Sequence, residues 1–202
     1  SEFLSNVSMS LVGMLYNTQL LKYAGNDGVV AYGVIMYVNM IFIAVFFGFS
    51  VGTSPVFSFN YGADNRQELH SLLFKSARIL LGLGLLLTLT AEVAAAPAAR
   101  LFVGYDAGMV SLTVRAQRIY MLSFLFCGLN LFASAWFTGL GNGQVSAVLA
   151  FSRSIVFEMG CVFILPAIFG AEGIWYSVII AEVLSLVMCV ALVARFRGRY
   201  GY

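Results

Sequence analysis

The chain has 202 residues, of which 61% are hydrophobic and only 10% are charged, and its formal net charge is +2. About a quarter of the residues of a typical soluble domain are charged, and a chain with so few charges could not cover its own core in water. The composition therefore excludes an ordinary soluble domain and indicates an integral membrane protein, and the small net charge gives no sign of nucleic-acid binding.

Six apolar stretches are long enough to cross a bilayer as helices. A hydrocarbon core of about 30 Å takes about 20 helical residues. The apolar runs are continuous and do not alternate with a period of two, so helices are expected rather than barrel strands. The predicted fold is an all-α, polytopic bundle over residues 1–202, with transmembrane helices at 3–23, 29–58, 72–96, 116–138, 145–168 and 174–194.

Turn residues separate the predicted spans. The connections at 25–28, 139–143 and 170–173 are short and rich in glycine. Two longer connections are expected, one from Asn60 to Arg66 with a basic extension and one from Pro97 to about Arg115. The second span is longer than a bilayer requires, and Pro55 lies in its last part. Because proline removes a backbone donor and clashes with the preceding turn, we expect a helix bend at Pro55, although an irregular helix end fits the same pattern.

Basic residues predict how the bundle is oriented in the membrane. With the N-terminal end in the cytoplasm, the cytoplasmic side receives Arg66, Lys75, Arg78, Arg153, Arg195, Arg197 and Arg199. The outer side then receives Lys22, Arg100, Arg115 and Arg118. Seven against four predicts that both ends of this segment are cytoplasmic. The chain opens without an initiator Met, so we expect it to be part of a longer protein.

Polar and small side chains recur at helical spacing within several spans. The first span carries Asn6, Ser10, Gly13 and Asn17, the second carries Tyr32 and Asn39, and the fourth carries Ser123, Cys127, Asn130 and Ser134. Such a stripe turns away from lipid, towards other helices or a water-filled cavity. Hydrogen bonding between helices is the simpler explanation for each serine, whereas cavity lining is the hypothesis for the three asparagines at 17, 39 and 130.

Two carboxylates lie inside predicted spans, Glu158 in the fifth and Glu182 in the sixth. At membrane depth a carboxylate pairs with a cation or takes up a proton, because desolvation disfavours its charged form. Both behaviours suit a coupling-ion site. The structural alternative is an ion pair, of Arg153 with Glu158 or with a carboxylate of a neighbouring helix. We expect these three residues to carry either ion coupling or a buried charge pair.

Catalytic and metal-binding patterns are absent from the sequence. There is a single histidine, His70, and the three cysteines lie in apolar runs without the spacing of a metal site. The aspartates Asp27, Asp64 and Asp106 lie in predicted connections, so no intramembrane aspartate pair can form. The chain is therefore not expected to be an enzyme or to hold a cofactor or metal.

Several short motifs, taken in order, resemble the second half of bacterial transporters of the multidrug and toxic compound extrusion (MATE) family. They are Leu11-Val12-Gly13-Met14-Leu15-Tyr16-Asn17, Gly52-Thr53-Ser54-Pro55, Asn60-Tyr61-Gly62-Ala63, the run from Ala135 to Gly143, and Gly173-Ile174-Trp175. The resemblance covers nearly the whole chain. The family's acidic residues of the seventh and tenth helices align with Met9 and near Cys127, so they are not carried over.

The resemblance implies a C-terminal six-helix lobe that faces a second lobe across a central cavity. It implies export of amphipathic, often cationic compounds in exchange for H⁺ or Na⁺ by alternating access, in a bacterial cytoplasmic membrane. The expected partners are the N-terminal lobe of the same polypeptide or a second half-transporter. The candidate cavity residues are Asn17, Tyr32, Asn39, Phe126 and Asn130, whose aromatic members offer ring faces to an organic cation.

Two other functions fit the same six spans. One is a flippase for lipid-linked saccharides of the same superfamily, which would favour basic residues inside the cavity. The other is a structural membrane subunit that does not transport, which requires the polar stripes to be fully paired in a dry bundle.

Overall fold

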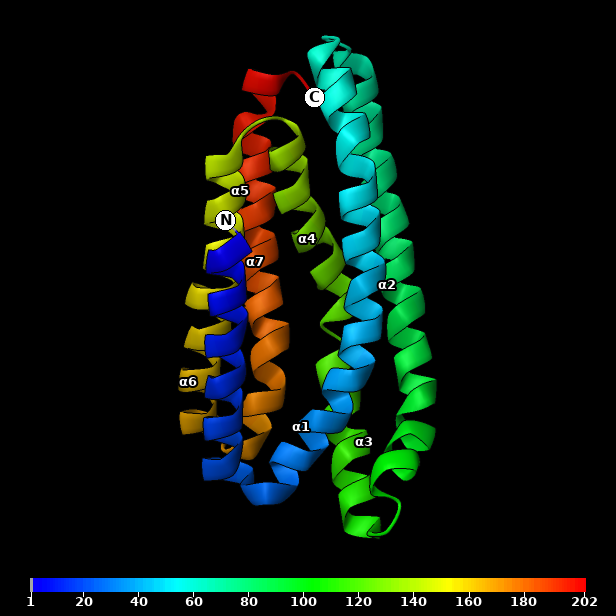
Figure 1. Cartoon of the computed structure of the whole chain (residues 1–202), viewed down its shortest axis with the longest axis vertical. Helices are drawn as coiled ribbons and strands as arrows, with labels where there is room; N and C mark the ends of the chain where they lie inside the picture. The colour runs from blue at the N-terminus through cyan, green and yellow to red at the C-terminus, as the bar shows by residue number, and fades with distance from the viewer. Residues whose placement is uncertain (1) are drawn as a thin grey trace.

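The computed structural model describes the backbone of residues 2–202 and the side chains of residues 10–202, and every regular element within them is helical. Figure 1 shows an elongated bundle whose helices run mostly along its long axis. The elements are α1 (Glu2–Gly62), α2 (Arg66–Val103), α3 (Ala107–Met121), α4 (Phe124–Gly139), α5 (Gly143–Phe151), the π-helix η1 (Ser152–Glu158), α6 (Met159–Phe169) and α7 (Ala171–Tyr200).

Helix α1 folds back on itself at Gly25. This residue has φ 66° and ψ −163°, values outside the helical region that are strongly disfavoured for residues with a side chain. The rings of Tyr16 and Tyr32 stack with centroids 5.1 Å apart, whereas residues 16 apart in a straight helix would be separated by about 24 Å. Figure 1 shows the first, dark-blue arm turning at the bottom into the second arm, so α1 supplies two membrane crossings.

The fourth crossing is a broken helix formed by α3 and α4. The two segments meet at an angle of 43° around Leu122 and Ser123. The break leaves the Met121 carbonyl without its usual helical donor, and the Thr88 hydroxyl of α2 donates to it at 3.5 Å. Gly84 lets α2 approach closely, because a Cβ atom there would lie 2.8 Å from the Phe124 carbonyl oxygen.

The prediction of two longer connections is wrong, because both are short turns in the structure. Helix α1 continues to Gly62 and α2 begins at Arg66, so only residues 63–65 separate them. Helix α2 continues through Pro97 to Val103, and α3 begins at Ala107. Proline forfeits one backbone hydrogen bond, which this long alanine-rich helix tolerates. The turn is confined to residues 104–106, where the Asp106 carboxylate accepts from the Gly108 and Met109 amides and starts α3.

The predicted all-helical membrane fold with six helices is confirmed. Among the described residues, α1, α2, the continuous α5–η1–α6 segment and α7 are each long and apolar enough to span a bilayer, and the α3–α4 pair forms a further, bent span. Because α1 contains two arms, these elements form six helical crossings. Pro55 lies inside α1, whose only non-helical residue is Gly25, and the bend expected at Pro55 stays a prediction.

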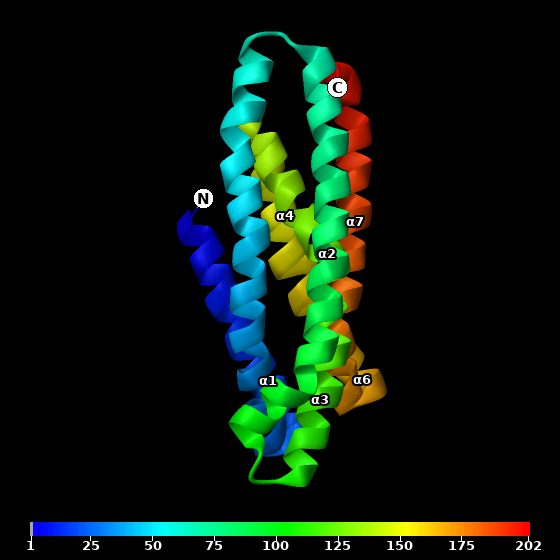
Figure 2. The ribbon, with the colours of Figure 1, turned by 90° about the vertical axis from the view of Figure 1, so that its right-hand side faces the viewer.

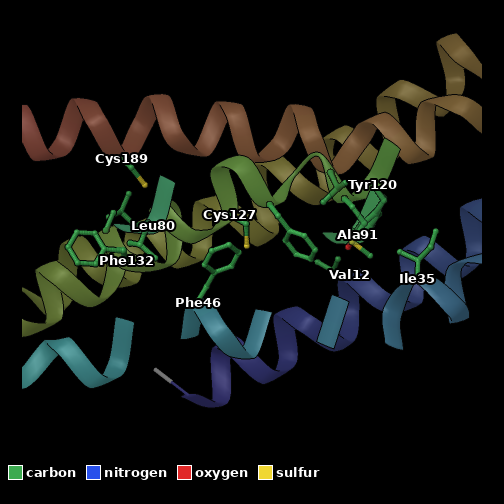
Figure 3. Packing of buried hydrophobic residues seen from close by; sticks show 14 of the residues in the cluster. Val12, Ile35, Phe46, Leu80, Ala91, Tyr120, Cys127, Phe132 and Cys189 are labelled. Carbon is green, nitrogen blue, oxygen red and sulfur yellow. The ribbon is translucent and has the colours of Figure 1, made fainter. Parts of the chain in front are cut away.

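Aromatic side chains form the core between the second arm of α1 and α4. The Phe57 ring lies 4.7 Å from that of Trp136 and 5.5 Å from that of Phe132, and both Phe57 and Trp136 are fully buried. Figure 3 shows Phe46 and Phe132 facing the same interior as Cys127, with Leu80 of α2 and Cys189 of α7 closing it. This packing fixes α4 in the centre of the bundle, against α1, α2 and α7.

Candidate functional site

A network of buried polar side chains joins α4, η1 and α7 at mid-bundle. The Glu182 carboxylate accepts from Arg153 Nε at 3.0 Å and Arg153 Nη2 at 2.5 Å, both on Oε1. Asn130 Nδ2 donates to Glu182 Oε2 at 2.6 Å and to the Glu182 carbonyl at 2.9 Å. Arg153 Nη2 also donates to Cys127 Sγ at 3.5 Å. These charge-assisted bonds tie three helices together where the surroundings are apolar.

The network is well shielded from solvent. The side chains of Glu182 and Arg153 are 6% and 19% exposed, and Asn130 is 2% exposed. Two opposite charges at this depth are tolerated only because they neutralise each other and their hydrogen-bonding groups find partners. Asn130 Oδ1 is the exception, since it has no hydrogen-bond partner among the described residues.

The π-helix explains how Arg153 and Glu158 come to the same region. Its hydrogen bonds run from i to i+5, so residues five apart lie close to one another along one face. Arg153 and Glu158 are five apart and both belong to η1. In a regular α-helix they would point in clearly different directions. Single π-turns occur frequently at functional sites, because they reorient a few side chains without ending the helix.

Glu158 lies beside a cluster of three buried tyrosines. Tyr16 and Tyr32 stack, and the Tyr120 ring lies 6.4 Å from that of Tyr32 in an edge-on arrangement. Glu158 lies within electrostatic range of all three tyrosine hydroxyls and of Arg153 and Glu182. It makes no hydrogen bond or ion pair with the part of the chain that the structure describes. The Tyr16 hydroxyl is also without a partner there.

The structure thus separates the roles of the two carboxylates. Glu182, a carboxylate of a neighbouring helix, forms an ion pair with Arg153. This was one of the two pairings that the sequence allowed. The other, between Arg153 and Glu158, does not form. Glu158 is left as a carboxyl group without a charge partner, next to a neutralised pair. Such a group can bind a proton or a cation, whereas a dry bundle with every charge matched could not.

The predicted cavity residues occupy three different surroundings. Asn17 is exposed on α1, where its side chain donates to the Gly13 carbonyl at 3.0 Å, and the half-buried Asn39 reaches Met36 Sδ at 4.0 Å on its own helix. Phe126 is half-buried. Tyr32 lies in the tyrosine cluster, and Asn130 lies in the Glu182 network. The side chains of Asn6 and Met9 lie outside the described residues.

The sequence did not predict Tyr16, Tyr120 or Cys127 as site residues, although Cys127 was noted in the polar stripe of the fourth span. Tyr16 lies 16 residues from Tyr32 and Tyr120 lies in another helix, so only the turn at Gly25 and the packing of α3 bring them together. No local pattern signals such contacts. The available signal was the excess of polar and aromatic groups on one face of each span.

The bundle also has cavities at its two ends. One of about 570 Å³ lies where α2 begins and α7 ends, and another of about 600 Å³ lies where α2 ends and α3 begins. Neither is lined by the Glu182 network or by the tyrosine cluster.

Comparison with known sequences gives a family match. The family model described as MatE matches residues 3–164. The multidrug export protein MepA of Staphylococcus haemolyticus is 23% identical over 197 residues, covering 98% of this chain and 43% of that protein. MepA of Staphylococcus aureus strain RF122 is 22% identical over 200 residues with the same coverage. The chain therefore spans less than half the length of the relatives that it matches.

Solved structures show the same fold. The chain superposes on an outward-facing multidrug resistance MATE transporter with a TM-score of 0.91, at 21% identity, covering 98% of this chain and 45% of that one. An inward-facing MATE transporter gives a TM-score of 0.90 at the same identity, covering 98% and 46%. A Pyrococcus furiosus transporter of the MOP superfamily, for which a binding pocket of reversed polarity is described, also gives 0.90 at 21% identity, covering 98% and 45%.

Proposed function

This chain belongs to the MatE family, and we propose that it is the C-terminal six-helix half of a multidrug exporter that exchanges amphipathic organic cations for H⁺ or Na⁺. The half would work by alternating access, opposite a second six-helix lobe. The second lobe would be the N-terminal part of the same polypeptide or a separate half-transporter. The proposed location is the bacterial cytoplasmic membrane, with both ends of this segment in the cytoplasm.

The observation that carries the mechanism is that one fold matches both transport states. The chain superposes equally well on an outward-facing and on an inward-facing transporter, with TM-scores of 0.91 and 0.90. A lobe that is the same in both states supports movement as a rigid body against its partner. The substrate class rests on the relatives, which are named multidrug export proteins.

Asn17 and Asn39 are proposed to face the second lobe. Asn17 is exposed on α1 and Asn39 is half-buried, and neither bonds to another helix among the described residues. Polar side chains on the outside of a transmembrane helix are disfavoured against lipid, so another protein surface or a wet cavity is the better environment. Phe126 and Tyr32 would add ring faces for an organic cation. Asn130 acts through Glu182, to which it donates.

Glu158 is proposed to bind the coupling ion. It is a carboxylate at membrane depth without an ion-pair partner in the described chain, because the nearby arginine is committed to Glu182. The Arg153–Glu182 pair keeps the surroundings close to neutral, which allows Glu158 to gain and lose a cation. The flippase alternative is weaker, because the one arginine inside the bundle has its charge matched by Glu182.

Efflux of a fluorescent organic cation from cells that express the full reading frame tests this proposal. External Na⁺ and pH are varied in turn, and efflux is expected to slow when the driving gradient is removed. Glu158→Gln is expected to abolish the dependence on that ion. Asp27→Asn is the matched control, because it removes an exposed carboxylate at the Gly25 turn. Efflux that is indifferent to both gradients would contradict antiport, and unchanged ion dependence in Glu158→Gln would contradict the assignment of Glu158.

A further inference from the structure

The cavity of about 570 Å³ at one end of the bundle has basic walls. Arg66, Gln67 and His70 from the first turns of α2 line one side, and Ala194, Arg197 and Gly198 from the last turns of α7 line the other. Figures 1 and 2 show that the C-terminus and the turn between α1 and α2 lie at this same end, which we call the basic end. The cavity joins two helices that are far apart in the sequence.

Positive charge at the basic end is only partly compensated. It carries six lysine and arginine residues, and the described carboxylates there are Asp64 and Glu68. Asp64 pairs with Arg66 at 2.9 Å and Glu68 with Lys75 at 3.7 Å, both on the surface. The cations without a carboxylate side chain as partner among the described residues are Arg78, Arg195, Arg197 and Arg199.

The two arginines of the cavity are held at its walls. Arg66 packs against the backbone of Gly201, since a Cβ atom there would lie 2.5 Å from Arg66 Cδ. Arg197 Nε donates to the Tyr202 backbone oxygen at 3.1 Å, which leaves its Nη groups available. The first turn of α2 adds partial positive charge, and the last turn of α7 adds partial negative charge of similar size. The arginine charges therefore decide the sign, and the cavity attracts anions.

The cavity at the opposite end differs in this respect. It has a similar volume, about 600 Å³, and is lined by Arg100, Arg115 and Arg118. Arg115 pairs with Glu172 and Arg118 with Glu92, each at 3.3 Å. Arg66 of the basic cavity is also paired, with Asp64, so each cavity keeps one arginine without a carboxylate side chain as partner. The difference lies in the charge of the two ends: Lys22, Arg100, Arg115 and Arg118 are balanced by Asp27, Glu92, Asp106 and Glu172 at this end, whereas six cations face two carboxylates at the basic end. The basic end is therefore the one that favours anions.

An apolar surface continues from the basic cavity along both helices. On α2, Phe74 is 49% exposed and its ring lies 4.7 Å from that of His70. On α7, Val190 is 60% exposed and lies one turn before Ala194. An anion-binding cavity that opens onto exposed apolar side chains of membrane helices matches a molecule with a charged head and hydrocarbon tails.

We propose that this cavity binds the phosphate-bearing headgroup of an anionic phospholipid, with its acyl chains along Phe74 and Val190. Arginine and phosphate form charge-assisted hydrogen bonds. Basic pockets between transmembrane helices at the cytoplasmic leaflet, where anionic lipids are enriched, are suited to such headgroups. The site lies apart from the Glu158 region, and it does not depend on transport.

Native mass spectrometry of the chain in detergent, titrated with phosphatidylglycerol or with phosphatidylcholine, tests the site. The wild type is expected to retain phosphatidylglycerol preferentially, and Arg66→Gln/Arg197→Gln is expected to lower that retention at least fivefold. Lys22→Gln/Arg100→Gln, which removes the same net charge at the other end, is expected to retain it fully. If the first double variant does not fold, Arg66→Lys/Arg197→Lys replaces it and is expected to keep the preference for the anionic lipid.

Three results would overturn the proposal. One is equal binding of the two lipids by the wild type. Another is an equal loss in both charge-neutralised variants, which would indicate general electrostatic attraction without a site. The last is full displacement of phosphatidylglycerol by millimolar inorganic phosphate, which would identify free phosphate as the ligand.

Discussion

The buried ion pair between Arg153 and Glu182 is expected to contribute to the stability of the bundle, and Glu182→Gln tests this contribution. Glu182 accepts two donors from Arg153 and one from Asn130, and its side chain is only 6% exposed. The substitution leaves a buried guanidinium without the carboxylate to which it is hydrogen-bonded. Removing one partner of a buried pair costs about 3–5 kcal/mol, and because Arg153 keeps 19% exposure we expect the lower end, about 3 kcal/mol.

Thermal unfolding in detergent, followed with a thiol-reactive dye, measures this effect. Cys127, Cys161 and Cys189 are all free and buried, so the dye reports unfolding directly. For a domain of this size, 1 kcal/mol corresponds to roughly 2–4 °C, so the melting temperature of Glu182→Gln should fall by roughly 6–12 °C. Glu68→Gln, in an exposed pair at 3.7 Å, is the control and should change little.

A double variant separates the cost of an unpaired charge from the value of the pair. Arg153→Met/Glu182→Leu removes both charges and keeps much of the volume, and it should recover most of the stability lost in Glu182→Gln. The reasoning is refuted if Glu182→Gln melts at the same temperature as Glu68→Gln. It is also refuted if the double variant is as unstable as the sum of the two single variants.

The same melting assay checks three further expectations. Gly84→Leu should lower the free energy of unfolding by about 1–3 kcal/mol, because its Cβ would lie 2.8 Å from the Phe124 carbonyl oxygen. Gly82→Leu is the control and should not lower it, because a Cβ there has no atom within 4 Å. Equal melting temperatures of the two variants would contradict the close approach of α2. Gly25→Ala should lower the free energy of unfolding by about 1–3 kcal/mol because φ is +66°, whereas Gly33→Ala should leave it unchanged or raise it. Tyr16→Phe removes a buried hydroxyl that has no partner in the described chain, so the melting temperature should hold or rise. A clear fall would reveal a partner for that hydroxyl.

The sequence predicted the helices well because membrane helices leave a strong local signal. Continuous apolar runs and glycine-rich connections gave the six crossings and the turn at Gly25. The predicted helix end at Pro97 was wrong, because α2 continues through this proline to Val103. The break at Leu122 and Ser123 has no glycine or proline to mark it, and depends on Thr88 and Gly84 of another helix.

The candidate site was only partly predictable, for a similar reason. Glu158, Glu182 and Arg153 stand out locally, because charges at membrane depth are rare. Their pairing is decided by tertiary structure, since Arg153 and Glu182 are 29 residues apart and the π-helix has no sequence signature. The gathering of Tyr16, Tyr32 and Tyr120 around Glu158 likewise depends on the fold of α1 and on the position of α3.

We propose that this chain is one lobe of a transporter and needs a second six-helix lobe to work. Efflux of a fluorescent organic cation is the most direct measurement, compared between cells that express the chain alone and cells that express the full reading frame. Membrane insertion of the chain is verified in each case. The chain alone is expected to insert but to give no efflux above that of cells without it, whereas the full reading frame is expected to export the dye. Equal efflux from the chain alone would contradict the proposal.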